Sequence, residues 1–349
     1  MSGTPSTKTW NMPLQFQTYL LPNTVATLHI PLWLGYNSVF KKDLFKDEVV
    51  LVTGGGTGIG RCIAHEMASL GALVVIAARK MDQLTATAEE IQKLGGRCDT
   101  MQINIRDPVK TREMVEAIVA KHGKLTCLVN NAGGQFMSPA SMLSSKGFAT
   151  VVDLNLNGTF NMCKAAFDGY MGEHGGRIVN VVAECRNGFP RLVHTGAARS
   201  GIINMTKTLA VEWGPYNGIR INCVAPGTIV SSGMKNYPES VVDMISTSDW
   251  MSPSGRYGTE SEIAASVVFL LSPAASYISG VNLAVDGGSS LSKGFPEGHE
   301  MAFNPEGSLM PAYVGWPEGK DNIHNLKHVD APSSINDLLD KYKKKKSKL

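Results

Sequence analysis

The sequence predicts an α/β protein whose core is a single doubly wound parallel sheet. Short apolar runs alternate along the chain with segments of helical periodicity, as the crossover connections between parallel strands require. The first apolar run ends in a glycine-rich loop, and a helical pattern starts directly after it. A chain of 349 residues, of which 43% are hydrophobic, can bury a core of this size, so a disordered chain is excluded.

Seven apolar runs predict the strands of this sheet. They cover residues 48–53, 72–77, 101–105, 125–130, 177–182, 220–225 and 282–285. Helical patterns cover residues 59–70 and 81–94, and a further helix is expected to start near Glu260. Because crossover connections between parallel strands are right-handed, helices should cover both faces of the sheet.

The alternation predicts one domain, residues 46–290, between an N-terminal arm, residues 1–45, and a C-terminal arm, residues 291–349. The stretch from Thr9 to Phe40 is apolar and carries no charged residue, but Pro22 and Pro31 interrupt it, so no membrane span is expected. Both arms are expected to pack against the domain or a neighbouring subunit. A lid over the ligand, or an N-terminal arm that binds a membrane surface, is the alternative.

The glycine-rich loop after the first strand predicts a dinucleotide site of the Rossmann type. Glycine allows a tight turn and close approach of the backbone to a pyrophosphate, and the N-terminus of the following helix offers free N–H groups. The strand before the loop and the helix after it make this interpretation specific. The loop residues expected to bind the cofactor are Gly54, Thr57, Gly58, Ile59 and Gly60.

The end of the second strand indicates which cofactor is bound. An NAD site usually has an Asp or Glu there, whereas this chain has Arg79 and Lys80. Two cations and no acid favour the 2′-phosphate of NADP(H). The alternative is a solvated Arg-Lys pair at the start of a helix, a place where cations are disfavoured.

Four motifs together resemble the short-chain dehydrogenase/reductase family over about residues 46–290. They are the T-G-x-x-x-G-I-G loop at residues 53–60, N-N-A-G at residues 130–133, N-L-N-G-T-F at residues 155–160, and N-C-V-A-P-G at residues 222–227. The resemblance implies that Asn131, Ala132 and Gly133 support the sheet and the adenine ribose. It places Pro226, Gly227 and Thr228 beside the nicotinamide carboxamide, and Asn104 and Ile105 near the adenine ring.

Compared with the family that it resembles, this chain has unusual residues at the catalytic positions. The family usually reduces carbonyls with a Tyr-x-x-x-Lys pair and a serine, but here Thr195, Arg199 and Val182 stand at those positions. Asn155, the family's fourth catalytic residue, remains. A threonine hydroxyl is too weak an acid to replace a phenol near neutral pH, so ketone and alcohol chemistry is disfavoured. Asn155, Thr195 and Arg199 are expected to orient substrate and cofactor.

Hydride addition to the β-carbon of an α,β-unsaturated thioester needs less acid catalysis. It generates an enolate, whose oxygen mainly needs hydrogen-bond donors, and the proton can arrive later from water. Further stretches, residues 131–140, 158–165, 188–190 and 194–199, resemble the peroxisomal trans-2-enoyl-CoA reductases, which also lack the Tyr-Lys pair and use NADPH. Dienoyl-CoA reductases resemble the chain less, because their tyrosine falls at Glu184. The alternatives are a dienoyl-CoA or other activated-alkene reductase, or a catalytically silent NADP-binding subunit.

Other residues near these motifs are weaker candidates. His194 and Glu184 are ionisable and could relay a proton, although a structural role is the commoner one for such residues. Arg186 and Arg191 could meet the phosphates of CoA, or be solvated loop arginines. Flexible methionines and aromatic residues between positions 234 and 251 favour an acyl pocket. They are Met234, Tyr237, Val242, Met244, Ile245, Trp250 and Met251.

Composition limits the remaining possibilities. Six isolated cysteines show no metal-ligand spacing and favour a reducing compartment, and a net charge of +3 is too small to suggest nucleic-acid binding. Asp286-Gly287-Gly288 resembles the family's closing strand, which implies a homo-oligomer, a dimer or tetramer. The terminal Ser347-Lys348-Leu349 predicts a peroxisomal address read by an import receptor in a eukaryote, and a cytoplasmic protein if the source is bacterial.

Overall fold

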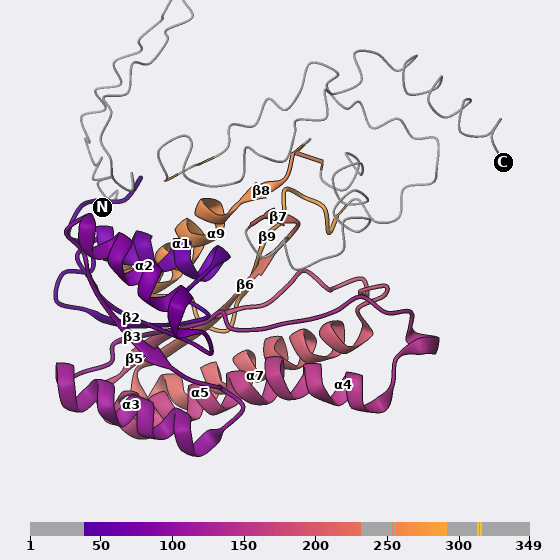
Figure 1. The fold of residues 1–349 in the computed structure, drawn as a ribbon, viewed down its shortest axis with the longest axis horizontal. Coiled ribbons are helices and arrows are strands. Elements are labelled where there is room, and N and C mark those ends of the chain that lie inside the picture. The colour runs from indigo at the N-terminus through magenta and orange to yellow at the C-terminus, as the bar shows by residue number, and fades with distance from the viewer. Residues whose placement is uncertain (1–37, 232–252, 255, 292–312, 314, 316–349) are drawn as a thin grey trace, which may run out of the picture. The chain divides into compact units, whose positions relative to one another are not determined.

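A computed structural model shows the doubly wound sheet that the sequence predicts (Figure 1). It describes residues 38–231, 253–254, 256–291, 313 and 315. The seven strands are all parallel and lie in the order β3-β2-β1-β4-β5-β6-β9. They are β1 (Val49–Thr53), β2 (Leu73–Ala78), β3 (Arg97–Gln102), β4 (Cys127–Asn130), β5 (Gly176–Val181), β6 (Ile219–Pro226) and β9 (Asn282–Val285).

Helices cover both faces of the sheet (Figure 1). One face carries α1 (Gly58–Ser69), α2 (Met81–Lys93) and α9 (Glu260–Leu271). The other carries α3 (Pro108–His122), α4 (Ser145–Val152), α5 (Gly158–Ala166) and α7 (Val193–Asn217). Shorter elements are η1 (Ala140–Met142), η2 (Asp153–Asn157), η3 (Phe167–Met171), α6 (Gly172–His174), η6 (Pro273–Ala275) and the strand pair β7 (Ile229–Val230) and β8 (Gly258–Thr259).

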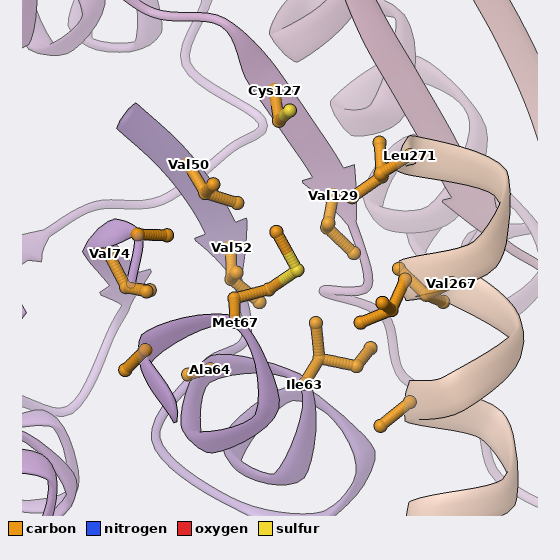
Figure 2. Close-up of a cluster of buried hydrophobic side chains, with 14 of the residues drawn as sticks. Val50, Val52, Ile63, Ala64, Met67, Val74, Cys127, Val129, Val267 and Leu271 are labelled. Atoms are coloured by element: carbon orange, nitrogen blue, oxygen red, sulfur yellow. The ribbon is translucent and has the colours of Figure 1, made fainter. Parts of the chain in front are cut away.

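The sheet divides the core into two clusters, and strand β1 contributes to both because its side chains alternate between the two faces. Val50 and Val52 pack against Ile63 and Met67 of α1 and against α9, as Figure 2 shows. Val49 and Leu51 belong to the cluster on the opposite face, with residues of α3, α5 and α7. All five side chains of β1 are buried, which is why this strand is a continuous apolar run in the sequence.

The third strand begins four residues earlier than expected. The sequence suggested residues 101–105, but β3 spans Arg97–Gln102 and is only partly buried. Gly95, at φ +82°, turns the chain out of α2 directly before it. Because β3 is an edge strand with one neighbour, polar residues are tolerated there. These polar residues interrupt the apolar run by which the sequence analysis located strands.

Residues from both expected arms contact the start of α9 and the middle of α1. The hydroxyl of Tyr313 donates to Oε2 of Glu66 at 3.3 Å, and Ser38 hydrogen-bonds the other oxygen of that carboxylate. The carbonyl of Tyr313 accepts from Thr259 at 2.6 Å, and the N–H of Gly315 donates to Ser261 at 2.9 Å. These contacts are direct packing on the domain. The expected acyl-pocket residues 234–251 and the terminal Ser347-Lys348-Leu349 lie outside the described residues.

Candidate active site

The glycine-rich loop connects the carboxyl end of β1 to α1. Gly54 has φ +67°, a conformation that L side chains rarely adopt. A methyl group at Gly60 would overlap the carbonyl group of Gly54, so α1 can start this close to the loop only with glycine there. The side chain of Thr57, the residue before α1, makes no capping hydrogen bond, which leaves N–H groups of the first turn for an anion.

The loop is fixed by two polar side chains. Thr53 Oγ1 accepts from the N–H groups of Asn131 and Ala132, each at 3.0 Å, and donates to the carbonyl of Val129. Asn131 Nδ2 donates back to the carbonyls of Thr53 and Gly54 at 3.1 and 3.3 Å. The predicted residues Asn131 and Ala132 therefore hold the shape of the glycine loop.

Two cations lie at the carboxyl end of β2. Arg79 and Lys80 are both exposed, and within the described residues neither forms an ion pair with a carboxylate. The Arg79 carbonyl accepts from Gln102 Nε2 at 3.0 Å, which fixes the backbone without using the guanidinium. The geometry thus offers positive charge at the place where the second strand meets its helix.

The segment after β3 holds two predicted cofactor residues, Asn104 and Ile105, whose side chains lie in different environments. Asn104 is exposed, and its Oδ1 accepts from the backbone N–H and from Nε of Arg106, both at 3.3 Å. Ile105 is buried and packs so closely on Gly158 that a methyl there would lie 2.7 Å from Cδ1 of Ile105. Asn104 can contact a ligand with its side chain, whereas the side chain of Ile105 belongs to the core.

The turn after β6 is held by backbone hydrogen bonds. The carbonyl of Pro226 accepts from the N–H of Glu184 at 3.1 Å, and the N–H of Gly227 donates to the carbonyl of Val285 at 3.0 Å. The carbonyl of Thr228 accepts from Gly258 at 3.1 Å. These contacts join the carboxyl ends of β5, β6 and β9 into one edge.

Asn155 lies in η2, a π-helical turn between α4 and α5. Its amide is completely buried and forms a two-way contact with Gly134, accepting from the N–H at 3.2 Å and donating to the carbonyl at 2.8 Å. Nδ2 also donates to the carbonyl of Val151 at 2.9 Å. Extra residues in a helix turn often mark functional positions, and here the turn points the amide at the loop after β4.

Arg199 reaches the same loop from α7. Its Nη1 donates to the carbonyl of Val181 at 3.0 Å, and its Nη2 lies against Gly133. A methyl on Gly133 would also lie 2.6 Å from Oδ1 of Asn155, so this glycine brings Arg199 and Asn155 together. Burial lowers the pKa of Arg199 to about 10, which still leaves it charged at neutral pH.

Thr195 is one helical turn before Arg199 on α7 and is completely buried. Its N–H donates to Nδ1 of His194 at 2.7 Å, and its Oγ1 lies 3.2 Å from the same nitrogen. The structure therefore places all three predicted catalytic residues around the carboxyl ends of β4 and β5.

Comparison with known proteins gives the family. The model of the enoyl-(acyl carrier protein) reductase family matches residues 54–290. The chain is 40% identical over 266 residues to the peroxisomal 2,4-dienoyl-CoA reductase of Mus musculus, covering 75% of this chain and 90% of that protein. It is 38% identical to the probable 2,4-dienoyl-CoA reductase of Bacillus subtilis, covering 70% and 97%.

Solved structures agree with this result. The citronellol catabolism dehydrogenase of Pseudomonas aeruginosa has a TM-score of 0.66 and 44% identity, covering 73% of this chain and all of that one. A short-chain dehydrogenase from Bacillus anthracis has a TM-score of 0.64 and 36% identity, covering 72% and 100%. The protein belongs to the short-chain dehydrogenase/reductase family.

Within this family the departures predicted at the catalytic positions are structurally accommodated. Val182, where a serine is usual, is buried with Ile202, Cys223 and Ala225, so this corner is apolar. Below it lies a buried polar chain that the sequence did not reveal: Asn130 Nδ2 donates to Asn180 Oδ1, and Asn180 Nδ2 donates to Thr206, each at 2.8 Å. Its members come from β4, β5 and α7. Because they lie far apart in the sequence, no local motif indicates that they contact one another.

Among the described residues, five buried side-chain atoms have no hydrogen-bond partner: Asn130 Oδ1 and Asn282 Oδ1 in the sheet, and Glu184 Oε2, His194 Nε2 and Arg199 Nε near this short-chain dehydrogenase/reductase site. Buried polar groups are rarely left unpaired in folded proteins. Glu184 Oε2 lies 3.6 Å from Nη2 of the exposed Arg186, too far for a hydrogen bond. Arg191 is also exposed, with φ +63°. Such a set of unused polar atoms fits a polar ligand.

In the parts of the chain that the structure describes, no group of three or more His, Cys, Asp or Glu side chains could hold a metal ion. All six cysteines are buried free thiols, and burial raises the pKa of Cys98 and Cys163 to about 12. Among the described helices, none is both long and apolar enough to cross a bilayer.

Proposed function

We propose that this short-chain dehydrogenase/reductase reduces trans-2-enoyl-CoA thioesters to acyl-CoA with NADPH, in fatty-acid metabolism. The observation that carries the proposal is the combination of an intact cofactor edge with a buried, non-acidic Thr195 and an apolar Val182. Such a site can orient a hydride donor but has no phenol to protonate an alkoxide. An enolate needs hydrogen-bond donors instead.

The residues present fit a dinucleotide. The overlap of a methyl at Gly60 with Gly54 shows that the loop leaves space only for backbone, and the uncapped start of α1 suits a pyrophosphate. Arg79 and Lys80 carry positive charge suited to a 2′-phosphate, and Asn104 offers an exposed amide. When bound, NADPH supplies the hydride.

The remaining chemistry falls to the chain's own side chains. Arg199 keeps a permanent charge beside the loop after β4, where it can hydrogen-bond a ribose and favour a developing negative charge. Asn155 fixes that loop through Gly134. Thr195 and its neighbours line the wall of the same corner, and the proton for the α-carbon is taken from water.

The second candidate is reduction of a 2,4-dienoyl-CoA, because relatives at 38–40% identity carry that name. Both reactions reduce a conjugated thioester, and they differ in whether the hydride adds to the β- or the δ-carbon. Glu184 stands where a tyrosine is expected in dienoyl-CoA reductases, which favours the first candidate. A catalytically silent NADP-binding subunit is the remaining alternative.

Product analysis with NADPH deuterated at the transferred position tests the choice. The proposal expects turnover of trans-2-decenoyl-CoA with deuterium at the β-carbon of decanoyl-CoA. Faster turnover of 2,4-decadienoyl-CoA, with deuterium at the δ-carbon of a 3-enoyl product, would favour the second candidate. Tight NADPH binding without turnover of any thioester would favour the silent subunit.

Location and assembly belong to the same proposal. The terminal Ser347-Lys348-Leu349 and the peroxisomal relative of Mus musculus support import into the peroxisome in a eukaryotic cell. A fluorescent fusion should lose its peroxisomal pattern when these three residues are removed. We also propose a homo-oligomer and a domain spanning residues 46–290 between two arms, which light scattering and limited proteolysis can check.

A further inference from the structure

We infer that His194 binds the thioester carbonyl oxygen of the substrate, with its Nε2–H as the hydrogen-bond donor that stabilises the enolate. This inference rests on the proposed function and deepens it, because it names the group that replaces the missing phenol. It also gives His194 a direct role in the reaction. The sequence alone marked this residue only as a weaker candidate for relaying a proton.

The hydrogen bonds at Nδ1 fix the tautomer of His194. Nδ1 accepts from the backbone N–H of Thr195 at 2.7 Å, so it cannot carry a proton itself. In a neutral imidazole the proton must then be on Nε2. The Thr195 hydroxyl, 3.2 Å from Nδ1, lies on the same side of the ring and supports this arrangement.

His194 is neutral because it is buried. Its side chain is fully inaccessible, and burial lowers its pKa, while the backbone carbonyls of Phe136 and Leu192 act in the opposite direction without reversing the shift. No carbonyl meets the distance and angle of a hydrogen bond with Nε2, although the carbonyls of Phe136 and Leu192 face the ring and act on its pKa. A donor N–H that is buried and unpartnered costs stability, and such a cost is expected where a ligand completes the contact.

The position of His194 suits a substrate oxygen. It lies in the first turn of α7, next to Thr195 and one turn before Arg199, whose Nη2 contacts Gly133. The ring of Phe136, on the loop after β4, lies edge-on to the imidazole with 4.7 Å between ring centroids. Phe136 is 43% exposed, so only this surface ring has to turn aside for an acyl thioester to reach the imidazole as the inference requires.

The step balances without any group beyond NADPH and water. The hydride forms the new C–H bond at the β-carbon, the C=C electron pair moves toward the thioester, and the carbonyl oxygen becomes an enolate oxygen. His194 keeps its proton and donates a hydrogen bond to that oxygen. Water then protonates the α-carbon, so the C=C bond is reduced and the nicotinamide is oxidised. A neutral donor of this kind stabilises charge that develops only in the transition state.

Two substitutions separate the donor from the structural role of His194. His194→Asn keeps an acceptor near Nδ1 for the Thr195 N–H but lacks the distal donor. His194→Gln places an amide N–H near Nε2. Steady-state rates with trans-2-decenoyl-CoA and NADPH should show kcat lowered by about 10²–10³-fold in His194→Asn, with KM changed far less. His194→Gln should recover at least tenfold of that loss.

The isotope effect from NADPH deuterated at the transferred position gives an independent readout. Because the loss of the donor slows hydride transfer, the isotope effect on kcat should increase in His194→Asn. Thr195→Val, which keeps the backbone N–H, should lower kcat only a few-fold. Equal melting temperatures of the His194 variants, within a few degrees, would show that all of them are folded.

The outcomes distinguish the two proposals. If the wild-type protein turns over no enoyl-CoA, the proposed function fails, and the role of His194 fails with it. If the wild type is active but His194→Asn has the same kcat, only the role of His194 is overturned. A larger loss in Thr195→Val than in His194→Asn would also overturn it, because the hydroxyl would then be the donor.

Discussion

Two parts of one sheet edge differ in how their polar groups are used. Around β1 and β4, Thr53 and Asn131 hydrogen-bond each other's backbone and hold the glycine loop. After β5 and at the start of α7, Nε2 of His194 and Nε of Arg199 have no hydrogen-bond partner among the described residues, and Oε2 of Glu184 has only its 3.6 Å ion pair with Arg186. The first part, here called the cofactor edge, is fixed mainly by its own contacts, whereas the second, here called the reducing edge, keeps polar atoms that we propose a ligand completes.

The comparison teaches that cofactor binding and acid catalysis are separable in this fold. The cofactor edge keeps the family's residues, and the reducing edge replaces its tyrosine, lysine and serine by Thr195, Arg199 and Val182. All three replacements are buried, so they are part of the packed structure and not surface variation. The change of reaction that we propose therefore involves residues of one edge only.

After the loss expected for His194→Asn, the next largest effect is expected at Arg199, which links the two edges through Gly133. Arg199→Met keeps most of the volume but removes the charge, so kcat/KM should fall roughly 10–150-fold, the equivalent of about 1.5–3 kcal/mol for hydrogen bonds to a charged group. Arg199→Lys restores the residue usual in the family and should recover part of the loss. Equal activity of Arg199→Met and wild type would contradict a link between the edges.

Gly60→Ala disturbs the cofactor edge alone. The added methyl overlaps the Gly54 carbonyl group, so the variant should lose about 1–3 kcal/mol of unfolding free energy and bind NADPH more weakly. The matched control is Gly214→Ala in α7, where the nearest atom to the new methyl is 3.8 Å away and stability should be unchanged or higher. Chemical denaturation measures the unfolding free energy, and fluorescence titration measures the affinity for NADPH. A Gly60→Ala variant with unchanged stability and unchanged affinity would disprove the close packing of the loop.

Much of the cofactor edge could be predicted from the sequence, because its residues lie in short continuous motifs. Gly54, Gly60 and Asn131 meet where the strand-loop-helix pattern requires. The reducing edge was only partly predictable: the absence of tyrosine was visible, but the tautomer of His194 depends on one backbone contact from Thr195. The chain from Asn130 through Asn180 to Thr206 could not be inferred, since three separate elements contribute to it.

Arg79 tests the choice of cofactor. Arg79→Ala should weaken NADPH binding about tenfold and leave NADH binding nearly unchanged, because only NADPH has the 2′-phosphate. Lys93→Ala, an exposed cation on α2 whose only described ion pair is with Glu89, serves as control and should change neither affinity. If Arg79→Ala weakened both cofactors equally, the guanidinium would have another role than phosphate recognition.

The smallest expected effect is a pH dependence at the contact between α1 and α2, outside both edges. Burial acts to raise the pKa of Glu90, but hydrogen bonds from His65 and Arg61 outweigh it and lower the pKa to about 2. The folded-state pKa lies below the unfolded value near 4.3, so this stabilisation is complete above that value and is lost as pH falls toward 2. Glu90→Gln should cost about 0.2–1 kcal/mol at pH 7 and less at pH 3. A cost that is the same at both pH values would exclude the ionic contribution.

Substrate discrimination by the purified full-length protein tests the central claim most directly. NADPH oxidation should be measured in parallel with trans-2-decenoyl-CoA, with 2-decanone and with decanal. The account predicts turnover of the thioester and none of the ketone or aldehyde, because the reducing edge can stabilise an enolate but cannot protonate an alkoxide. Reduction of 2-decanone or decanal at a rate comparable to that of the thioester would contradict it.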